Sequence, residues 1–144
     1  MSADQFRTMT GYLEHQAGEL SATMEDYLEM ICRLTKNDGY ARISRLAELL
    51  QVKPSSASKM AAQLRRLGYI EYANYSAIQL TEKGQDYGAY LLHRHQVLES
   101  FLCLLNKTEN ETEQVELIEH FIRPQTIANL EQLSQILLTK QIDF

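Results

Sequence analysis

Two glutamates and a histidine stand close together in the stretch VELIEH, residues 115–120. If the stretch is helical, Glu116, Glu119 and His120 lie at positions i, i+3 and i+4 and share one face of the helix. Carboxylate oxygens and an imidazole nitrogen on one face can bind a divalent metal ion. They can equally form an ordinary solvated face of charged side chains. The stretch alone leaves both interpretations open.

The stretch MEDYLEMI, residues 24–31, contains a second acidic pair. Asp26 and Glu29 are three residues apart, so on a helix they lie together, off the stripe of apolar side chains. Two histidines in a later helical pattern differ in position. His95 lies on the flank of the apolar face, whereas His93 points away from it and is expected to be solvated. Each feature is common by itself, so the elements that carry them must be considered together.

Hydrophobic periodicity and end signals predict six helices and one hairpin. The first helix begins near Ser21 or Thr23 and ends at NDG. The third helix begins after VKPSS, with Ser55 or Ser56 as its cap, and ends at Gly68. The remaining elements are a short helix from Ser44, a hairpin within YIEYANYSAIQL, a long helix over about 82–105 capped by Thr81, and helices over about 111–122 and 125–139 with Pro124 at the corner.

The order helix, turn, helix, glycine and hairpin is that of a winged helix-turn-helix, in which the second helix of the pair enters the major groove of DNA. One side of that helix is apolar. The other side carries short, hydrogen-bonding and cationic side chains, which suit base edges and phosphates, although an ordinary solvent-exposed helix could look similar. The predicted DNA-contacting residues, with the wing tip included, are Arg42, Ser55, Ser56, Ser58, Lys59, Gln63, Arg66, Asn74 and Tyr75.

Charge is unevenly distributed along the chain. The formal net charge is −5, which argues against a general nucleic-acid binder. Residues 42–85, however, contain seven cations and three anions, whereas residues 95–144 contain three cations and eight anions. The first segment can face phosphates, and the second cannot.

Length and composition limit the class of protein. A chain of 144 residues can bury one core, or form one small domain with a helical extension. No apolar run approaches the roughly 18 residues of a membrane span, and the polar start does not resemble a signal peptide. Cys32 and Cys103 are isolated, which fits packed thiols in a reducing compartment. We therefore expect a cytoplasmic protein without a membrane partner.

Together these motifs resemble one known family. From about Met24 to Leu138, the stretches MEDYLEMI, LAELLQVKPSSASKMAAQL, GYIEY, LTEKG, RHQVLESFL and VELIEH are similar to the diphtheria toxin repressor family of metal-dependent transcriptional regulators, in particular its manganese transport regulator branch. Six residues, in order and on three predicted helices, match the positions where that branch places its manganese ligands: Asp26, Glu29, His95, Glu116, Glu119 and His120.

The resemblance implies a mainly α fold, with an N-terminal winged helix-turn-helix of three helices and a two-stranded wing, followed by an all-helical dimerisation domain. We expect an N-terminal arm at 1–20, the DNA-binding domain at 21–89 and the metal-binding and dimerisation domain at 90–144. The arm departs from the family pattern, and the length leaves no room for the SH3-like third domain of the iron-sensing branch. We expect a homodimer that binds double-stranded DNA at a palindromic operator.

The resemblance also implies the metal. Four carboxylates and two imidazoles without a thiolate suit Mn²⁺, and shared glutamates could bridge two ions per subunit. The iron-sensing branch has methionine and cysteine where this chain has Asp26 and Glu119, which favours manganese, although Fe²⁺, Co²⁺, Zn²⁺ or Cd²⁺ could bind in vitro. We therefore expect a manganese-responsive transcriptional regulator, a repressor of metal uptake genes, and not an enzyme.

Three alternatives use part of the same pattern. An iron- or zinc-responsive regulator would have the same fold. A di-metal carboxylate enzyme in a helical bundle would use Glu-x-x-His ligands like those of VELIEH, but it leaves the basic helix face and the wing without a role. A winged-helix repressor that responds to a small organic ligand leaves the six-residue set unexplained.

Overall fold

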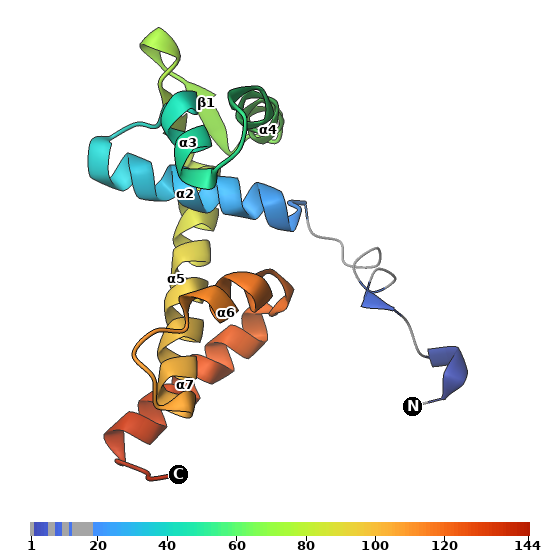
Figure 1. The fold of residues 1–144 in the computed structure, drawn as a ribbon, viewed down its shortest axis with the longest axis vertical. Helices are drawn as coiled ribbons and strands as arrows, with labels where there is room; N and C mark the ends of the chain where they lie inside the picture. The colour runs from blue at the N-terminus through green and yellow to red at the C-terminus, as the bar shows by residue number, and fades with distance from the viewer. Residues whose placement is uncertain (1, 6–7, 10–11, 13–18) are drawn as a thin grey trace.

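The computed structural model of this chain describes residues 2–5, 8–9, 12 and 19–144 (Figure 1). The winged part, residues 22–80, lies at one end of the molecule, and the two C-terminal helices lie at the other. The long helix α5, Glu82–Asn106, reaches from one end to the other. The predicted arm at 1–20 falls mainly outside the described residues, apart from a short 3-10 turn, η1, at Ala3–Gln5.

The described residues form six α-helices and a two-stranded antiparallel sheet, which confirms the predicted fold class. In the sheet, Glu71 of β1 pairs with Gln79 of β2. The elements after η1 are α2 Ala22–Asp38, α3 Ile43–Leu50, α4 Pro54–Arg66, β1 Ile70–Tyr72, η2 Asn74–Ser76, β2 Ile78–Leu80, α5 Glu82–Asn106, α6 Thr112–Ile118, η3 Glu119–Phe121 and α7 Pro124–Thr139.

The ends of α2 and α5 follow the predicted capping signals. Ser21 accepts a hydrogen bond from the backbone N–H of Met24, and Gly39 ends α2 in the left-handed conformation that glycine adopts without strain. Thr81 caps α5 by accepting from the N–H of Gly84. These local contacts fix where the two longest ligand-bearing helices begin.

The predicted cap of α4 is wrong. Lys53 is the N-cap residue and makes no side-chain capping bond, Pro54 occupies the first turn, and Ser55 and Ser56 lie inside the helix. Proline favours the first helical position because its fixed φ suits the helix and its missing N–H has no partner there in any case. The helix therefore starts before the two serines, which leaves their hydroxyls exposed on its first turn.

The predicted helix over 111–122 is also interrupted. α6 ends at Ile118, and the chain continues as the 3-10 turn η3. A 3-10 turn advances about 120° per residue rather than about 100°, so Glu119 and His120 leave the face on which an uninterrupted helix would place Glu116.

Two apolar clusters hold the two ends of the molecule. The larger cluster buries Leu28, Leu46 and Leu64 from α2, α3 and α4, and it reaches Leu91 on α5. The smaller cluster packs α5 against α6 and α7. Because α5 is continuous across residues 89 and 90, the predicted domain boundary falls inside a helix, and the division remains a prediction. No helix of the described residues is long and apolar enough to cross a membrane.

One close backbone approach yields a test of this packing. A Cβ on Gly84 would collide with the backbone carbonyl oxygen of Tyr69, which is held by the N–H of Thr81 at 3.1 Å. A Cβ on Gly88 would meet only the Cys32 side chain, with Sγ at 3.1 Å. We expect Gly84→Ala to lower the free energy of unfolding by about 1–3 kcal/mol.

Gly88→Ala is the matched control. It should be nearly neutral in urea unfolding, because the gain in helix propensity offsets a small shift of the thiol. Equal stability of the two variants would show that the corner between β1 and α5 is not closely packed.

Candidate metal centre and nucleic-acid interface

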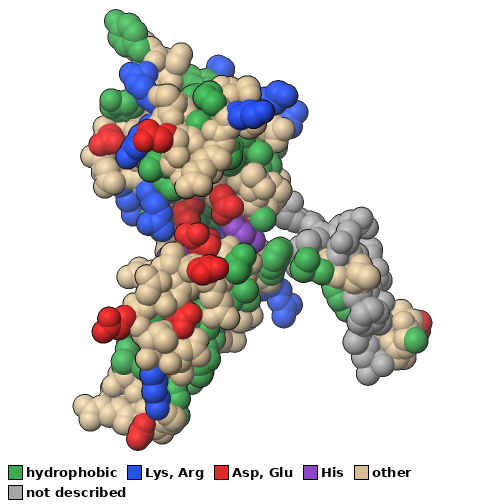
Figure 2. All heavy atoms as spheres, viewed as in Figure 1, with side chains coloured by type: hydrophobic (Ala, Val, Ile, Leu, Met, Phe, Trp, Pro, Cys, Tyr) green, Lys and Arg blue, Asp and Glu red, His purple; other side chains and the backbone are tan. Residues whose placement is uncertain are grey.

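Acidic and histidine side chains gather where the winged part meets α6 and α7, at the narrow waist of the molecule (Figure 2). They come from α2, from the middle of α5 and from η3. These elements are far apart in sequence and are brought together because α5 crosses α2 and packs on η3. On the face shown, most Lys and Arg side chains lie on the winged part instead.

The first group of potential metal ligands combines Asp26, Glu119 and His120, which can each offer one atom within 4.8 Å of the others. His120 Nε2 lies 2.8 Å from Asp26 Oδ1 and 4.0 Å from Glu119 Oε1. Asp26 is exposed on α2, whereas Glu119 is only 1% exposed. The group therefore joins an accessible carboxylate on one element to a buried one on another.

The second group combines Glu29, His95 and Glu119 under the same distance limit. His95 Nδ1 lies 3.1 Å from Glu119 Oε2, and Glu29 reaches the group from α2. Glu119 thus belongs to both groups, with one carboxylate oxygen near each histidine. Five of the six predicted ligands converge in this way.

Glu116 is the predicted ligand that joins neither group. It is exposed on α6, although it lines the same cavity as Asp26 and Glu29. The change from α-helix to 3-10 turn after Ile118 accounts for the separation, because it turns the two following ligands toward α5 and leaves Glu116 behind.

Several buried polar atoms here have no hydrogen-bond partner among the described residues. They include Glu29 Oε1 and Glu99 Oε2, and also His120 Nε2, whose approach to Asp26 lacks the geometry of a hydrogen bond. Buried polar atoms are usually satisfied by protein, water or an ion. These atoms do have ionic neighbours, since His120 Nε2 lies 2.8 Å from Asp26 Oδ1 and Glu29 Oε1 lies 4.0 Å from Arg33, but carboxylate oxygens and imidazole nitrogens gathered at one place also fit a divalent cation by their chemistry.

The surroundings raise the pKa of two of these groups, His120 and Glu29. Burial by itself lowers the pKa of His120, but the contacts with Asp26 and Glu25 outweigh it and raise the pKa to about 9. Burial, together with the nearby charge of Glu119, raises the pKa of Glu29 to about 7. Both groups therefore carry protons near neutral pH that a cation has to displace.

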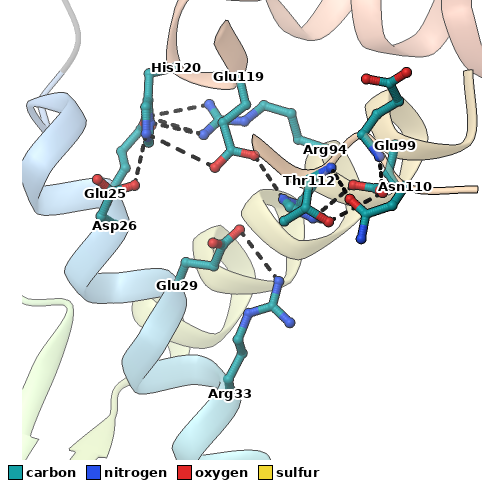
Figure 3. Close-up of polar contacts among 12 residues, drawn as sticks. Glu25, Asp26, Glu29, Arg33, Arg94, Glu99, Asn110, Thr112, Glu119 and His120 are labelled. Carbon is teal, nitrogen blue, oxygen red and sulfur yellow. Dashed lines mark hydrogen bonds and ion pairs between the residues drawn. The ribbon is translucent and has the colours of Figure 1, made fainter. Parts of the chain in front are cut away.

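Two buried charged residues of the waist were not among the predicted site residues. Glu25 is 6% exposed and Arg94 is 3% exposed, and they form a salt bridge at 3.3 Å (Figure 3). The sequence does contain a signal for Arg94, because it occupies the apolar stripe of α5 at helical spacing from Leu91 and Leu98. An arginine in such a stripe needs a buried partner.

Glu99 connects the second donor group to the loop before α6. Its Oε1 accepts from the backbone N–H of Glu111 at 2.9 Å and from the Thr112 hydroxyl at 3.3 Å, as Figure 3 shows. Its Oε2 lies 3.6 Å from Nε2 of His95. The side chain therefore ties the start of α6 to the same turn of α5 that carries His95. His93, in contrast, has a 48% exposed side chain and pairs with Glu131 on α7 at 3.0 Å, away from both groups.

The candidate DNA surface lies on α4 and the wing. Ala57, Ala61 and Leu64 bury the inner face of α4 completely. The predicted contact residues are all exposed: Arg42, Ser55, Ser56, Ser58, Lys59, Gln63, Arg66, Asn74 and Tyr75. Polar and cationic side chains thus line the open side of the helix.

The wing tip is held by one of the predicted contact residues. Arg42 donates to the backbone carbonyl of Tyr75 at 2.6 Å, and its guanidinium lies 5.1 Å from the ring centroid of Tyr40. Tyr75 has a positive φ of 62° and a side chain that is 90% exposed. Arg42 therefore supports the wing in addition to any contact with phosphate.

Two family models cover most of the chain. Residues 19–78 match "Iron dependent repressor, N-terminal DNA binding domain", and residues 81–137 match "Iron dependent repressor, metal binding and dimerisation domain". The chain is 40% identical over 116 residues to the HTH-type transcriptional regulator MntR of Lysinibacillus sphaericus, a match that covers 80% of this chain and 84% of that protein. It is 42% identical over 114 residues to MntR of Geobacillus thermodenitrificans, covering 78% of this chain and 81% of that protein.

Solved structures support the fold. The structure of the manganese regulator SloR matches with a TM-score of 0.69 at 24% identity, over 78% of this chain and 53% of that chain. The crystal structure of ScaR with bound Zn²⁺ matches with a TM-score of 0.68 at 25% identity, over 78% of this chain and 53% of that chain. The chain therefore spans about half the length of these two solved proteins.

The raised pKa of Glu29 predicts how stability depends on pH in the metal-free protein. Between the ordinary value of 4.5 and about 7, the folded chain retains a proton that the unfolded chain has released. Stability should therefore fall as the pH rises through this window, by about 1–3 kcal/mol. Glu29→Gln carries no titrating group, so its unfolding free energy, measured in urea with a chelator from pH 5 to 8, should fall less steeply.

Glu48→Gln, at an exposed position of α3, serves as the control and should follow the parent. His120 also contributes to the free energy of unfolding, and this contribution is lost as the pH rises above about 6.5. Because all three proteins contain His120, the loss is common to them. A Glu29→Gln curve parallel to that of the parent would contradict the raised pKa.

Proposed function

This chain belongs to the iron-dependent repressor family, also called the diphtheria toxin repressor family, and we propose that it is a manganese-responsive regulator whose metal centre controls binding to a palindromic operator. The matched domains and the named relatives make it a metal-responsive, DNA-binding transcriptional regulator and a homodimer, and not an enzyme. The observation that carries the proposal is the place of Glu119 in two donor groups that join α2 to α5 and η3.

The proposed ligands are the six residues of the predicted set. Asp26, Glu119 and His120 would hold one ion, and Glu29, His95 and Glu119 a second, with Glu119 as the shared carboxylate. Glu116 lines the cavity beside Asp26 and would complete the first set after a change of rotamer or a small movement of α6. We therefore propose two ions per subunit.

The donor set favours Mn²⁺. Carboxylate oxygens and imidazole nitrogens are hard or intermediate ligands, and no thiolate or thioether belongs to either group. The relatives named MntR and the manganese regulator SloR agree with this choice. Fe²⁺, Co²⁺, Zn²⁺ and Cd²⁺ can compete in vitro because affinity for divalent ions follows the Irving–Williams order. An iron- or zinc-responsive regulator of the same fold is therefore the second candidate.

Through α2, the proposed ligands couple metal binding to DNA binding. Asp26 and Glu29 stand on α2, whose other face supplies Leu28 and Ile31 to the core beneath α4. When ionised, the carboxylates of the two groups repel one another, which loosens the contact between α2 and η3. A bound divalent cation supplies the missing positive charge and holds α2 against η3. Since the coupling is reciprocal, DNA should strengthen metal binding by the same factor.

An exposed apolar surface supports the dimer. Large apolar side chains on and near α6 and α7 face solvent in the single chain: Leu117, Phe121, Leu133, Ile136, Leu138, Ile142 and Phe144. Apolar surfaces of this kind are usually covered by a partner, and a two-fold dimer is the commonest arrangement. Two copies of α4, related by a two-fold axis, would read half-sites about one helical turn, roughly 34 Å, apart, which is why we propose a palindromic operator.

The proposal is tested by DNA binding with and without Mn²⁺, using fluorescence anisotropy on operator DNA selected from a random library. Added Mn²⁺ should increase the affinity, and a chelator should abolish the increase. His95→Ala should lower Mn²⁺ affinity by about 10-fold or more, because loss of a ligand should cost at least as much as loss of an outer-shell partner.

His93→Ala is the matched control. Its side chain pairs with Glu131 on the surface and joins neither donor group, so this variant should bind Mn²⁺ and DNA like the parent. If Mn²⁺ leaves the DNA affinity of the parent unchanged, the metal-responsive function is wrong. If both variants lose the response equally, the assignment of His95 as a ligand is wrong.

A separate prediction concerns the outer face of α4. Lys59→Ala and Arg66→Ala should each weaken DNA binding and reduce the slope of log affinity against log salt by about 0.9 for each lost phosphate contact. Mn²⁺ affinity without DNA should not change. Lys140→Ala removes a cation at the far end of α7 and should leave the slope as it is in the parent. Parent-like slopes in both α4 variants would contradict the assignment of this face.

A further inference from the structure

Glu25 lies directly beside the proposed ligand Asp26 but turns in a different direction. It is almost completely buried, and both of its oxygens are occupied (Figure 3). Oε1 lies 2.8 Å from His120 Nδ1 and 3.3 Å from both terminal nitrogens of Arg94. Oε2 accepts from the hydroxyl of Tyr87. The side chain belongs to neither donor group.

The partners determine the direction of the hydrogen bond to His120. An arginine only donates, and an ionised carboxylate only accepts. Nδ1 of His120 lies 3.3 Å from Arg94 Nη2 but only 2.8 Å from Glu25 Oε1. A lone pair on Nδ1 would face the carboxylate at the shorter of these distances, so Nδ1 must carry hydrogen and donate it to Glu25.

The opposite nitrogen is therefore the one that can release its proton. Nε2 points away from Glu25, toward Asp26 at 2.8 Å and Glu119 at 4.0 Å, which are the other members of the first donor group. A metal-binding histidine commonly donates its second ring N–H to a carboxylate, which fixes the ring orientation and makes the ligand nitrogen more basic.

We propose that Glu25 is a positioning residue of the metal centre, which holds the ring of His120 with hydrogen on Nδ1 so that Nε2 faces the ion, while Arg94 and Tyr87 hold Glu25 in place. The inference rests on the proposed function, because it assigns a role beside the same site. Three elements take part: Glu25 stands on α2, its two supports stand on α5, and His120 stands on η3. The contact thus orients a ligand across the junction of the two parts of the chain.

The direct test replaces Glu25 by Gln, which preserves size but removes the charge that requires Nδ1 to donate. In the metal-free parent, a ¹H–¹⁵N NMR spectrum should contain a slowly exchanging Nδ1–H signal of His120, assigned by its absence in His120→Ala. Glu25→Gln should weaken or lose that signal. Its Mn²⁺ affinity, measured by competition with a chelating dye, should fall by about 10- to 100-fold.

A matched pair on α5 separates positioning from general packing. Tyr87→Phe removes the hydroxyl that donates to Glu25, and Tyr87 belongs to neither donor group. Tyr90→Phe makes the same chemical change three residues later, where the hydroxyl has no hydrogen-bond partner among the described residues. We expect Tyr87→Phe to weaken Mn²⁺ binding several-fold and to broaden the Nδ1–H signal, and Tyr90→Phe to match the parent in both measurements.

The outcomes distinguish this inference from the function on which it rests. Parent-like Mn²⁺ affinity in both Glu25→Gln and Tyr87→Phe, with weakened binding in His120→Ala, overturns the positioning role and leaves the proposed function standing. A parent that binds no Mn²⁺ overturns both. Should Glu25→Gln fail to fold, as judged by circular dichroism, Tyr87→Phe against Tyr90→Phe still decides.

Discussion

The rest of this structure depends on one constraint, the cost of bringing several carboxylates together at a partly buried junction. Asp26, Glu29 and Glu119 converge from two elements around His95 and His120. Burial disfavours ionisation of Glu29, and the nearby charge of Glu119 adds to the penalty, so the pKa of Glu29 is raised. His120, whose pKa is raised to about 9, offsets part of this charge by retaining its proton. A divalent cation at the same place offsets it without a proton, so the junction is most stable when loaded.

The location of this constraint explains how a small ion can affect a distant helix. α5 belongs to both apolar clusters, so it joins the two parts of the chain covalently but does not by itself fix α2 against η3. Direct contacts across the junction do so: Asp26 and Glu25 on α2 each lie 2.8 Å from a ring nitrogen of His120 on η3. α2 in turn contacts α3 and α4 through the larger core, and that core is close-packed. A restraint on α2 would therefore act on α4 through this shared core.

Local signals made most of the fold predictable from the sequence. Ser21, Gly39 and Thr81 cap their helices as expected, and the inner and outer faces of α4 follow from the spacing of its apolar residues. Two expectations were wrong. Residues 119–121 form a 3-10 turn that buries Glu119 next to α5, and the start of α4 is set by a local signal, Pro54. The six proposed ligands came from a family resemblance, since spacing alone left the solvated-face interpretation open.

The pairing of Glu25 with Arg94 depends on tertiary packing, although the place of Arg94 in the apolar stripe of α5 indicates that it needs a buried partner. Glu25 is buried and Asp26 is exposed, although they are consecutive residues, because Arg94 and Tyr87 of α5 contact Glu25. Arg94 forms its salt bridge with Glu25, at 3.3 Å, and with no carboxylate of the two donor groups among the described residues, although its charge still acts to lower the pKa of Glu29. Had the arginine instead faced Glu119, it would have occupied the site with a permanent internal cation, and the junction would no longer depend on an exchangeable one. The partnering of Arg94 with Glu25 therefore leaves the deficit of positive charge at the donors, where a metal ion can respond to it.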